Sequence, residues 1–122
     1  MGKRVLLVED EPNIMEAIRY LLLRDGFTVD THSDGRSAVA AVLGKRPDMV
    51  ILDVMLPGRS GFDILHDLRA CGETADLPVL MLTARGQTKD RELAERYGAS
   101  RFMTKPFSNA EMLASVRELA GP

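Results

Sequence analysis

The sequence predicts an α/β fold: a five-stranded parallel sheet with helices on both faces. Three short runs are apolar at every position, at residues 5–8, 49–52 and 79–82. A run that is apolar throughout, rather than alternately, indicates a strand buried on both sides, as in a parallel sheet. Longer amphipathic segments separate these runs, and strict alternation of strand and helix predicts helices on both faces. Right-handed crossovers then make 2-1-3-4-5 the expected strand order.

Two weaker strands complete the predicted sheet, at residues 28–31 and 101–104. The first of them is expected at an edge of the sheet, since only one of its sides needs to be apolar. A helix is predicted between the first two strands, where Pro12 suits the first turn and Gly26 the exit. The apolar residues of this helix recur at helical spacing, and they are Ile14, Ala17, Ile18, Leu21 and Leu22.

Four further helices follow the other strands. Ser60 is placed to open the third helix, and Gly98 to end the fourth. Ser108, with Glu111 three residues later, has the pattern of a capping box at the start of the fifth. The apolar positions at helical spacing are Ala38, Ala41 and Val42 in the second helix, Phe62, Leu65 and Leu68 in the third, Leu93, Ala94 and Tyr97 in the fourth, and Met112, Val116 and Leu119 in the fifth.

Composition indicates a single globular domain over residues 1–122. A chain of 122 residues with 45% hydrophobic residues can form one core without disulfides or a structural metal. The net charge of −2 gives no reason to expect direct binding to nucleic acid or to a membrane surface. Cys71 is the single cysteine, and the sequence shows neither a leader pattern nor an apolar run of membrane-spanning length, so a cytoplasmic location is expected.

Polar and charged residues follow the predicted strands at one end of the sheet. The first strand is predicted to end in Glu9 and Asp10, the third in Asp53, the fourth in Thr83 and the fifth in Lys105. In an open parallel sheet, binding sites form beyond the carboxyl ends of the strands, where the strand order reverses. An acidic residue after a strand is most often a turn former or a helix cap, so each residue alone is weak evidence. Their occurrence at the same end of one sheet is what indicates a site.

This set of residues has a chemical meaning. Neighbouring carboxylates repel one another and need a proton or a cation, and an all-oxygen set suits Mg²⁺, which also takes phosphate oxygens. The ammonium of Lys105 and the hydroxyl of Thr83 can hold other phosphoryl oxygens, which leaves Asp53 as an aspartyl nucleophile. His32 and His66 are far apart in sequence and are interpreted as ordinary surface or packing residues, so no zinc site is expected.

Four segments together resemble the receiver domain of two-component response regulators. They are residues 5–11 (VLLVEDE), 50–58 (VILDVMLPG), 80–84 (LMLTA) and 102–107 (FMTKPF), in that order. The resemblance covers nearly the whole chain and implies the flavodoxin-like, CheY-like form of the α/β fold. It also implies a phosphoacceptor signalling switch that assists its own phosphorylation and dephosphorylation, rather than an enzyme with a separate substrate.

By this resemblance, Asp53 accepts a phosphoryl group from the histidine of a sensor histidine kinase or a phosphotransfer protein. Mg²⁺ is then the expected cofactor. Its protein ligands would be the carboxylates of Glu9, Asp10 and Asp53, together with the backbone carbonyl of Met55. Many relatives carry aspartate where this chain has Glu9, so this longer side chain is expected to act on the metal through a water molecule.

The resemblance also assigns a switch. Thr83 matches the switch hydroxyl, Phe102 the switch aromatic and Lys105 the phosphate-binding lysine, and the bond from Lys105 to Pro106 resembles a cis peptide of the family. Phosphorylation is expected to draw Thr83 toward the phosphate and to let Phe102 turn inward, which changes the surface of the fourth helix, fifth strand and fifth helix. A plain core aromatic is the alternative interpretation of Phe102. Because phenylalanine lacks the tyrosine hydroxyl, we hypothesise that the unphosphorylated protein samples the inward state more than a Phe102→Tyr variant does.

Two residues are expected to set the lifetime of the phosphorylated state. Met55 stands where aspartyl phosphatases carry an acid–base aspartate, and Arg85 could partly cover the phosphoryl group, so self-dephosphorylation over minutes to hours is expected. Three alternatives stay open: an aspartyl-phosphate phosphatase, a pseudo-receiver that never takes phosphate, and a nucleotide-binding flavodoxin-like domain. The output partner or domain is unknown, and the expected state is a monomer or a weak phosphorylation-dependent homodimer.

Overall fold

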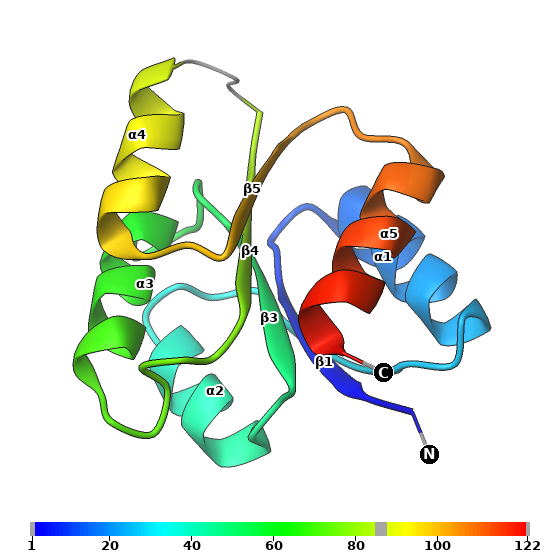
Figure 1. Cartoon of the computed structure of the whole chain (residues 1–122), viewed down its shortest axis with the longest axis horizontal. Helices are drawn as coiled ribbons and strands as arrows, with labels where there is room; N and C mark the ends of the chain where they lie inside the picture. The colour runs from blue at the N-terminus through cyan, green and yellow to red at the C-terminus, as the bar shows by residue number, and fades with distance from the viewer. Residues whose placement is uncertain (1, 85–87, 122) are drawn as a thin grey trace.

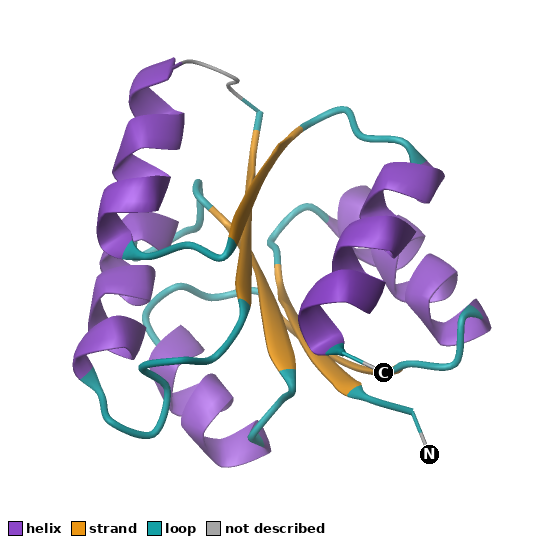
Figure 2. Ribbon diagram, viewed as in Figure 1, coloured by secondary structure: helices purple, strands orange, loops and turns teal. Residues whose placement is uncertain are grey.

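Strands and helices alternate along the whole of residues 2–84 and 88–121, the part of the chain that the computed structural model describes (Figure 1, Figure 2). The strands are β1 (Arg4–Val8), β2 (Thr28–His32), β3 (Met49–Asp53), β4 (Val79–Thr83) and β5 (Arg101–Thr104). All neighbouring strands are parallel and their order is β2-β1-β3-β4-β5. The predicted fold class is confirmed, and the second strand lies at an edge as expected.

The helices cover both faces of this sheet. They are α1 (Pro12–Arg24), α2 (Ala38–Lys45), α3 (Gly61–Ala70), α4 (Thr88–Tyr97) and α5 (Asn109–Ala120). Figure 1 shows α1 and α5 against one face and α2, α3 and α4 against the other. None of the described helices combines the length and the apolar character of a membrane span.

Burial on both faces explains the continuous apolar runs. Leu6 and Val8 of β1 belong to the core layer on the side of α2 and α3, whereas Val5 and Leu7 belong to the layer on the side of α1 and α5. Every residue of β3 and β4 is buried. Because successive side chains of a strand point to opposite faces, a central strand covered on both sides must be apolar at every position.

The residues predicted to begin and end helices have the expected contacts and backbone conformation. Oγ of Ser60 accepts the amide of Phe62 at 3.1 Å at the start of α3, and Oγ of Ser108 accepts the amide of Glu111 at 3.0 Å at the start of α5. Each bond satisfies an amide that has no partner within its own helix. Gly26 follows α1 with a φ of +94°, a conformation that favours glycine.

Candidate functional site

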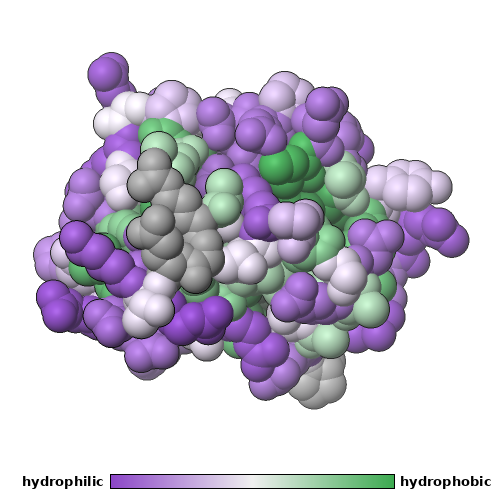
Figure 3. All heavy atoms as spheres, turned by 90° about the horizontal axis from the view of Figure 1, so that it is seen from above, coloured by the Kyte–Doolittle hydropathy of each residue, from purple (hydrophilic) through white to green (hydrophobic). Residues whose placement is uncertain are grey.

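The carboxyl ends of four neighbouring strands meet at one edge of the sheet, at the top of Figure 1. Glu9 and Asp10 directly follow β1, Asp53 and Thr83 are the last residues of β3 and β4, and Lys105 directly follows β5. Parallel pairing therefore brings these five residues to the same edge, although they are far apart in sequence. Figure 3 looks down on this edge, where hydrophilic residues dominate and the hydrophobic areas are small and separate.

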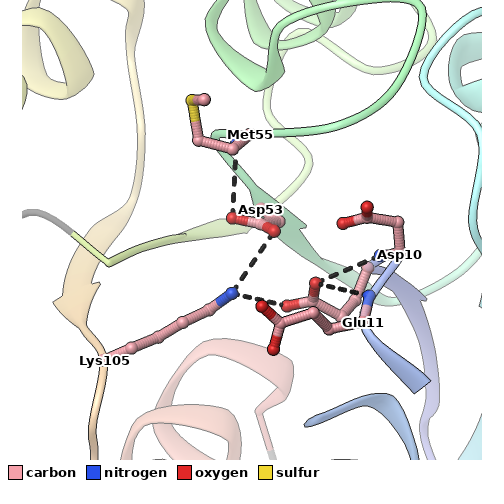
Figure 4. A network of polar contacts seen from close by, with 6 residues as sticks. Asp10, Glu11, Asp53, Met55 and Lys105 are labelled. Carbon is pink, nitrogen blue, oxygen red and sulfur yellow. Dashed lines mark hydrogen bonds and ion pairs between the residues drawn. The ribbon is translucent and has the colours of Figure 1, made fainter. Parts of the chain in front are cut away.

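Lys105 joins the two buried carboxyl groups of this edge. Its Nζ atom lies 2.9 Å from Oε1 of Glu9 and 3.3 Å from Oδ2 of Asp53 (Figure 4). The lysine side chain is 14% exposed. Burial on its own would lower the pKa of Lys105, but the bonds and charges of Glu9 and Asp53 outweigh it and raise that pKa above its usual value. The amine is therefore a cation at neutral pH.

Glu9 uses its two carboxylate oxygens differently. Oε2 accepts the backbone amides of Asp10 and Glu11, each at 3.1 Å, which holds the turn after β1, while Oε1 faces Lys105. The side chain is fully buried. Burial alone would raise the pKa of Glu9, but the contacts with Lys105, Asp53 and the Glu11 amide lower it below its usual value. Glu9 is thus the ionised member of the buried pair.

Asp53 is a buried carboxyl group beside that buried carboxylate. Its Oδ1 atom accepts the backbone amide of Met55 at 3.3 Å. Burial, and then the closeness of Glu9, raise the pKa of Asp53 to about 7, although Lys105 and the Met55 amide act in the opposite direction. The charge of Asp53 therefore depends on what binds beside it, and a cation would favour the carboxylate form.

The backbone of Asp53 is held by a glycine that sequence reasoning did not single out. A Cβ atom on Gly61, the first residue of α3, would lie 2.2 Å from the carbonyl oxygen of Asp53 and 2.9 Å from Cα of Val54. The Gly61 amide also donates to the carbonyl of Val54 at 2.8 Å. Only a residue without a side chain permits this approach. The available signal was a poor helix former placed directly after the cap Ser60.

The acidic cluster has the composition of a magnesium site. Glu9, Asp10 and Asp53 each offer a carboxylate oxygen, and these three atoms lie within 4.8 Å of one another. Asp10 is exposed, so the cluster is open to solvent on its side. Two of these carboxyl groups, those of Glu9 and Asp53, contact the ammonium of Lys105, and Asp10 is a third acidic group of the cluster. The cluster thus holds more acidic groups than the one ammonium can balance, which favours a further cation. An all-oxygen set of this kind suits a hard divalent ion that keeps several waters, so these residues fit Mg²⁺.

Thr83 and Phe102 lie on the same face of the sheet. Thr83 pairs with Thr104 in the parallel register, and Phe102 precedes Thr104 by two residues, so their side chains point to one side. Thr83 is buried, and Phe102 is partly buried against the core layer on the side of α3 and α4. The guanidinium of Arg91, on α4, lies over the Phe102 ring at 5.1 Å from its centroid.

Met55 reaches solvent beside the acidic cluster. The residue is 65% exposed, and its side chain points away from the Asp53 carboxylate (Figure 4). Arg85, the other residue expected to affect the lifetime of the phosphorylated state, lies outside the described residues. The peptide bond between Lys105 and Pro106 is cis, as the resemblance implies.

The histidines and the cysteine have ordinary local contacts. Nε2 of His32 lies 2.8 Å from Oγ of Ser37, and the ring of His66 packs edge-on against Tyr97 with centroids 5.9 Å apart. Within the described residues, neither histidine belongs to a group that could hold a metal. Cys71 is a partly buried free thiol at the end of α3. These contacts agree with the interpretation of both histidines as surface or packing residues.

Curated proteins with similar sequences include transcriptional regulators. The response regulator receiver domain family matches residues 5–117. The transcriptional regulatory protein TcrA of Mycobacterium tuberculosis is 48% identical over 119 residues, which cover 98% of this chain and 46% of TcrA. The phosphate regulon transcriptional regulatory protein PhoB of Escherichia coli is 41% identical over 117 residues, which cover 96% of this chain and 51% of PhoB. The chain thus spans about half the length of the curated relatives it matches.

Solved receiver domains share the architecture of nearly the whole chain. The receiver domain of the sensor histidine kinase PA1611 from Pseudomonas aeruginosa, with a magnesium ion in its active site cleft, is 30% identical with a TM-score of 0.91 and covers 100% of both chains. The BeF3-activated receiver domain of RstA from Klebsiella pneumoniae is 29% identical with a TM-score of 0.88, covering 98% of this chain and 99% of that domain. Since the sequence match extends over residues 5–117 and the fold is shared, the chain belongs to the response regulator receiver domain family of two-component signalling.

Proposed function

We propose that this receiver domain is a magnesium-dependent switch in which Asp53 accepts a phosphoryl group from the histidine of a sensor histidine kinase or a phosphotransfer protein. The observation that carries the proposal is the ammonium of Lys105, 3.3 Å from Oδ2 of Asp53 and within the acidic cluster. A cation in that place can hold an oxygen of a phosphoryl group attached to Asp53. The same ammonium balances part of the charge that the buried carboxyl groups carry before transfer.

The transfer step follows from the chemistry of Asp53. One carboxylate oxygen forms the new O–P bond as the N–P bond of the donor histidine breaks. The histidine keeps the electron pair of that bond and takes a proton from solvent. Attack requires the ionised form of Asp53, which is only partly populated at neutral pH because its pKa is about 7. A cation bound in the cluster raises the ionised fraction and so favours the step.

Asp10, Asp53 and the backbone carbonyl of Met55 are the groups we assign to Mg²⁺. The ion, when bound, supplies positive charge to the phosphoryl oxygens and to the carboxylate that receives them. Glu9 acts through a water molecule, because its Oε2 atom already accepts two amides and its Oε1 atom faces Lys105. Its buried negative charge keeps the lysine in place.

Phosphorylation then controls the surface formed by α4, β5 and α5. The hydroxyl of Thr83 moves to a phosphoryl oxygen, and Phe102, on the same face of the sheet, turns inward toward the space beside it. TcrA and PhoB are transcriptional regulatory proteins about twice as long as this chain, so we extend the proposal to an output domain or partner that this surface controls. Weak pairing of two phosphorylated copies is part of the same proposal.

The phosphorylated state is long-lived. Met55 stands two residues after the acceptor, and a thioether can neither accept nor donate a proton to activate water there. We therefore expect loss of the phosphoryl group over minutes to hours in the absence of a phosphatase. Loss of label from purified phosphorylated protein within seconds would contradict this assignment.

The test compares the response to a phosphate mimic in wild type and Asp53→Ala. With Mg²⁺ and beryllofluoride, the wild type is expected to show NMR shifts at Thr83, Phe102 and the α4–β5–α5 surface, whereas Asp53→Ala shows none. Asp63→Asn, which changes an exposed carboxylate on α3, is the matched control and should respond like wild type. Sedimentation of the same samples measures pairing. A folded wild type that does not respond would identify a pseudo-receiver and refute the proposal.

A further inference from the structure

Arg91 of α4 contacts the side chain that the proposed switch moves. Its guanidinium carbon lies over the Phe102 ring, 5.1 Å from the ring centroid. The face of an aromatic ring attracts a cation in this position, and guanidinium is the cation most often found there. Within residues 2–84 and 88–121, no carboxylate lies at ion-pair distance from Arg91. The ring is therefore the contact that orients this guanidinium.

Arg91 and Phe102 line a groove between α4 and β5. The groove has a volume of about 240 Å³, and its walls also include Ala94 of α4 and Arg101 of β5. Space on this side means that close packing alone does not hold the Phe102 ring in its observed orientation. The guanidinium is the charged group that covers the ring there.

The other end of α4 is fastened to α3. Nε of Arg69 donates to the carbonyl of Gly98, just after α4, at 2.9 Å, and a Cβ on Gly98 would meet the Arg69 side chain at 3.2 Å. The ring of Tyr97 lies 6.1 Å from that of Phe62 and 5.9 Å from that of His66, all measured between centroids. The C-terminal end of α4 is thus held by several contacts along α3, beside which it runs in Figure 1.

We infer that Arg91 is a positioning residue for Phe102, which stabilises the observed ring orientation in the unphosphorylated protein and couples that orientation to the first turn of α4. The inference rests on the proposed function, since it takes Phe102 as the side chain that turns. The observed ring is only partly buried, whereas Thr83 is buried, so we take the observed orientation as the one that precedes the inward turn. Turning toward Thr83 would move the ring away from the guanidinium. The charge–ring attraction therefore opposes the inward state until phosphorylation of Asp53 outweighs it.

The experiment replaces Arg91 in two ways and uses a second arginine of the same helix as a control. Arg91→Met removes the charge and keeps a long, unbranched side chain. Arg91→Lys keeps a positive charge, but on an ammonium group that is found over aromatic rings less often than guanidinium. Arg96→Met changes an exposed arginine near the other end of α4, whereas the guanidinium over the ring is that of Arg91. Relaxation-dispersion NMR of metal-free, unphosphorylated protein measures the inward population of Phe102, and thermal unfolding shows that each variant is folded.

We expect Arg91→Met to raise the inward population about two- to five-fold, Arg91→Lys to raise it less, and Arg96→Met to leave it unchanged. Because the coupling is reciprocal, the affinity for beryllofluoride with Mg²⁺ should rise by no more than the same factor in Arg91→Met. An Arg91→Met variant whose inward population equals that of Arg96→Met overturns the inference.

The mimic also separates this failure from a failure of the proposed function. If beryllofluoride brings the wild-type Phe102 ring inward but Arg91→Met has no effect on the unphosphorylated population, only the role of Arg91 is wrong. If beryllofluoride binds without turning the wild-type ring, the switch assigned to Phe102 is wrong and the inference falls with it.

Discussion

A methyl group added at Gly61 tests whether the backbone of the acceptor strand is held as the structure describes. In Gly61→Ala, the new Cβ would lie 2.2 Å from the carbonyl oxygen of Asp53 and 2.9 Å from Cα of Val54. Neither is the end of a flexible side chain, so β3 and α3 must move apart by about 1.2 Å for the distance of 2.2 Å to reach the 3.4 Å of an ordinary contact. Overpacking of this kind costs about 1–3 kcal/mol, which we expect as the loss in unfolding free energy.

Urea unfolding and beryllofluoride binding are the two assays for this variant. Gly44→Ala is the matched control, because Gly44 lies within α2 and a Cβ there would meet no atom within 4 Å. That control should gain about 0.5–1 kcal/mol, since alanine is the better helix former. The shifted Asp53 backbone should also weaken binding of the mimic in Gly61→Ala, while Gly44→Ala binds it like wild type.

The reasoning is wrong if Gly61→Ala unfolds at the same urea concentration as wild type and binds the mimic equally well. Such a result would mean that β3 and α3 separate at no cost, and that the close approach at Gly61 does not position the acceptor. A loss of stability with unchanged binding would keep the packing argument and remove the link to Asp53.

Three other expectations follow from the same edge of the sheet and from the last helix. Lys105→Met removes the ammonium between two buried carboxyl groups, so urea unfolding at neutral pH should show an unfolding free energy lower by about 3 kcal/mol. Lys89→Met, which changes an exposed residue of α4, should change the unfolding free energy little. The raised pKa of Asp53, about 7, should appear as the midpoint of its carboxyl-carbon NMR titration in metal-free protein. The pKa of Asp53 in the folded state lies above its unfolded value of about 3.9. Its contribution to stability is therefore complete below a pH of about 3.9 and is lost as pH rises through about 7. Because Mg²⁺ competes with the proton, it should bind more tightly as pH rises over the same range. Ser108→Ala should lower the unfolding free energy by about 1 kcal/mol through loss of the α5 cap, and Ser108→Asp should restore most of it, again by urea unfolding.

The apolar runs in the sequence are shorter than the observed strands. The apolar runs at residues 49–52 and 79–82 end where the polar residues begin, but β3 continues to Asp53 and β4 to Thr83. The amide of Val54 still donates to the carbonyl of Leu82, and that of Lys105 to the carbonyl of Thr83. Backbone hydrogen bonds do not depend on side-chain polarity, so a hydrophobic pattern marks the apolar part of a strand, and the buried polar residues Asp53 and Thr83 extend each strand by one position beyond it.

The sequence pattern could not predict contacts between side chains that are distant in sequence. The sequence placed Lys105 at the edge of the sheet with the acidic residues. It did not predict that the amine of Lys105 lies nearer to Glu9 than to Asp53. It also gave no sign that Arg91 covers Phe102, since both residues fit their own helix and strand without each other. Such distances depend on the twist of the sheet and on the length of each side chain, which no local pattern encodes.

The order of apolar runs and amphipathic segments determined the fold class, the edge where the site lies and the residue types that reach it, because a parallel sheet aligns the ends of all its strands. Only the tertiary structure decided the protonation of the groups at that edge. Glu9 is buried but keeps its charge, the pKa of Asp53 is raised to about 7, and the amine of Lys105 contacts both carboxyl groups. Burial and mutual distance set those charges, and both exist only once the chain has folded.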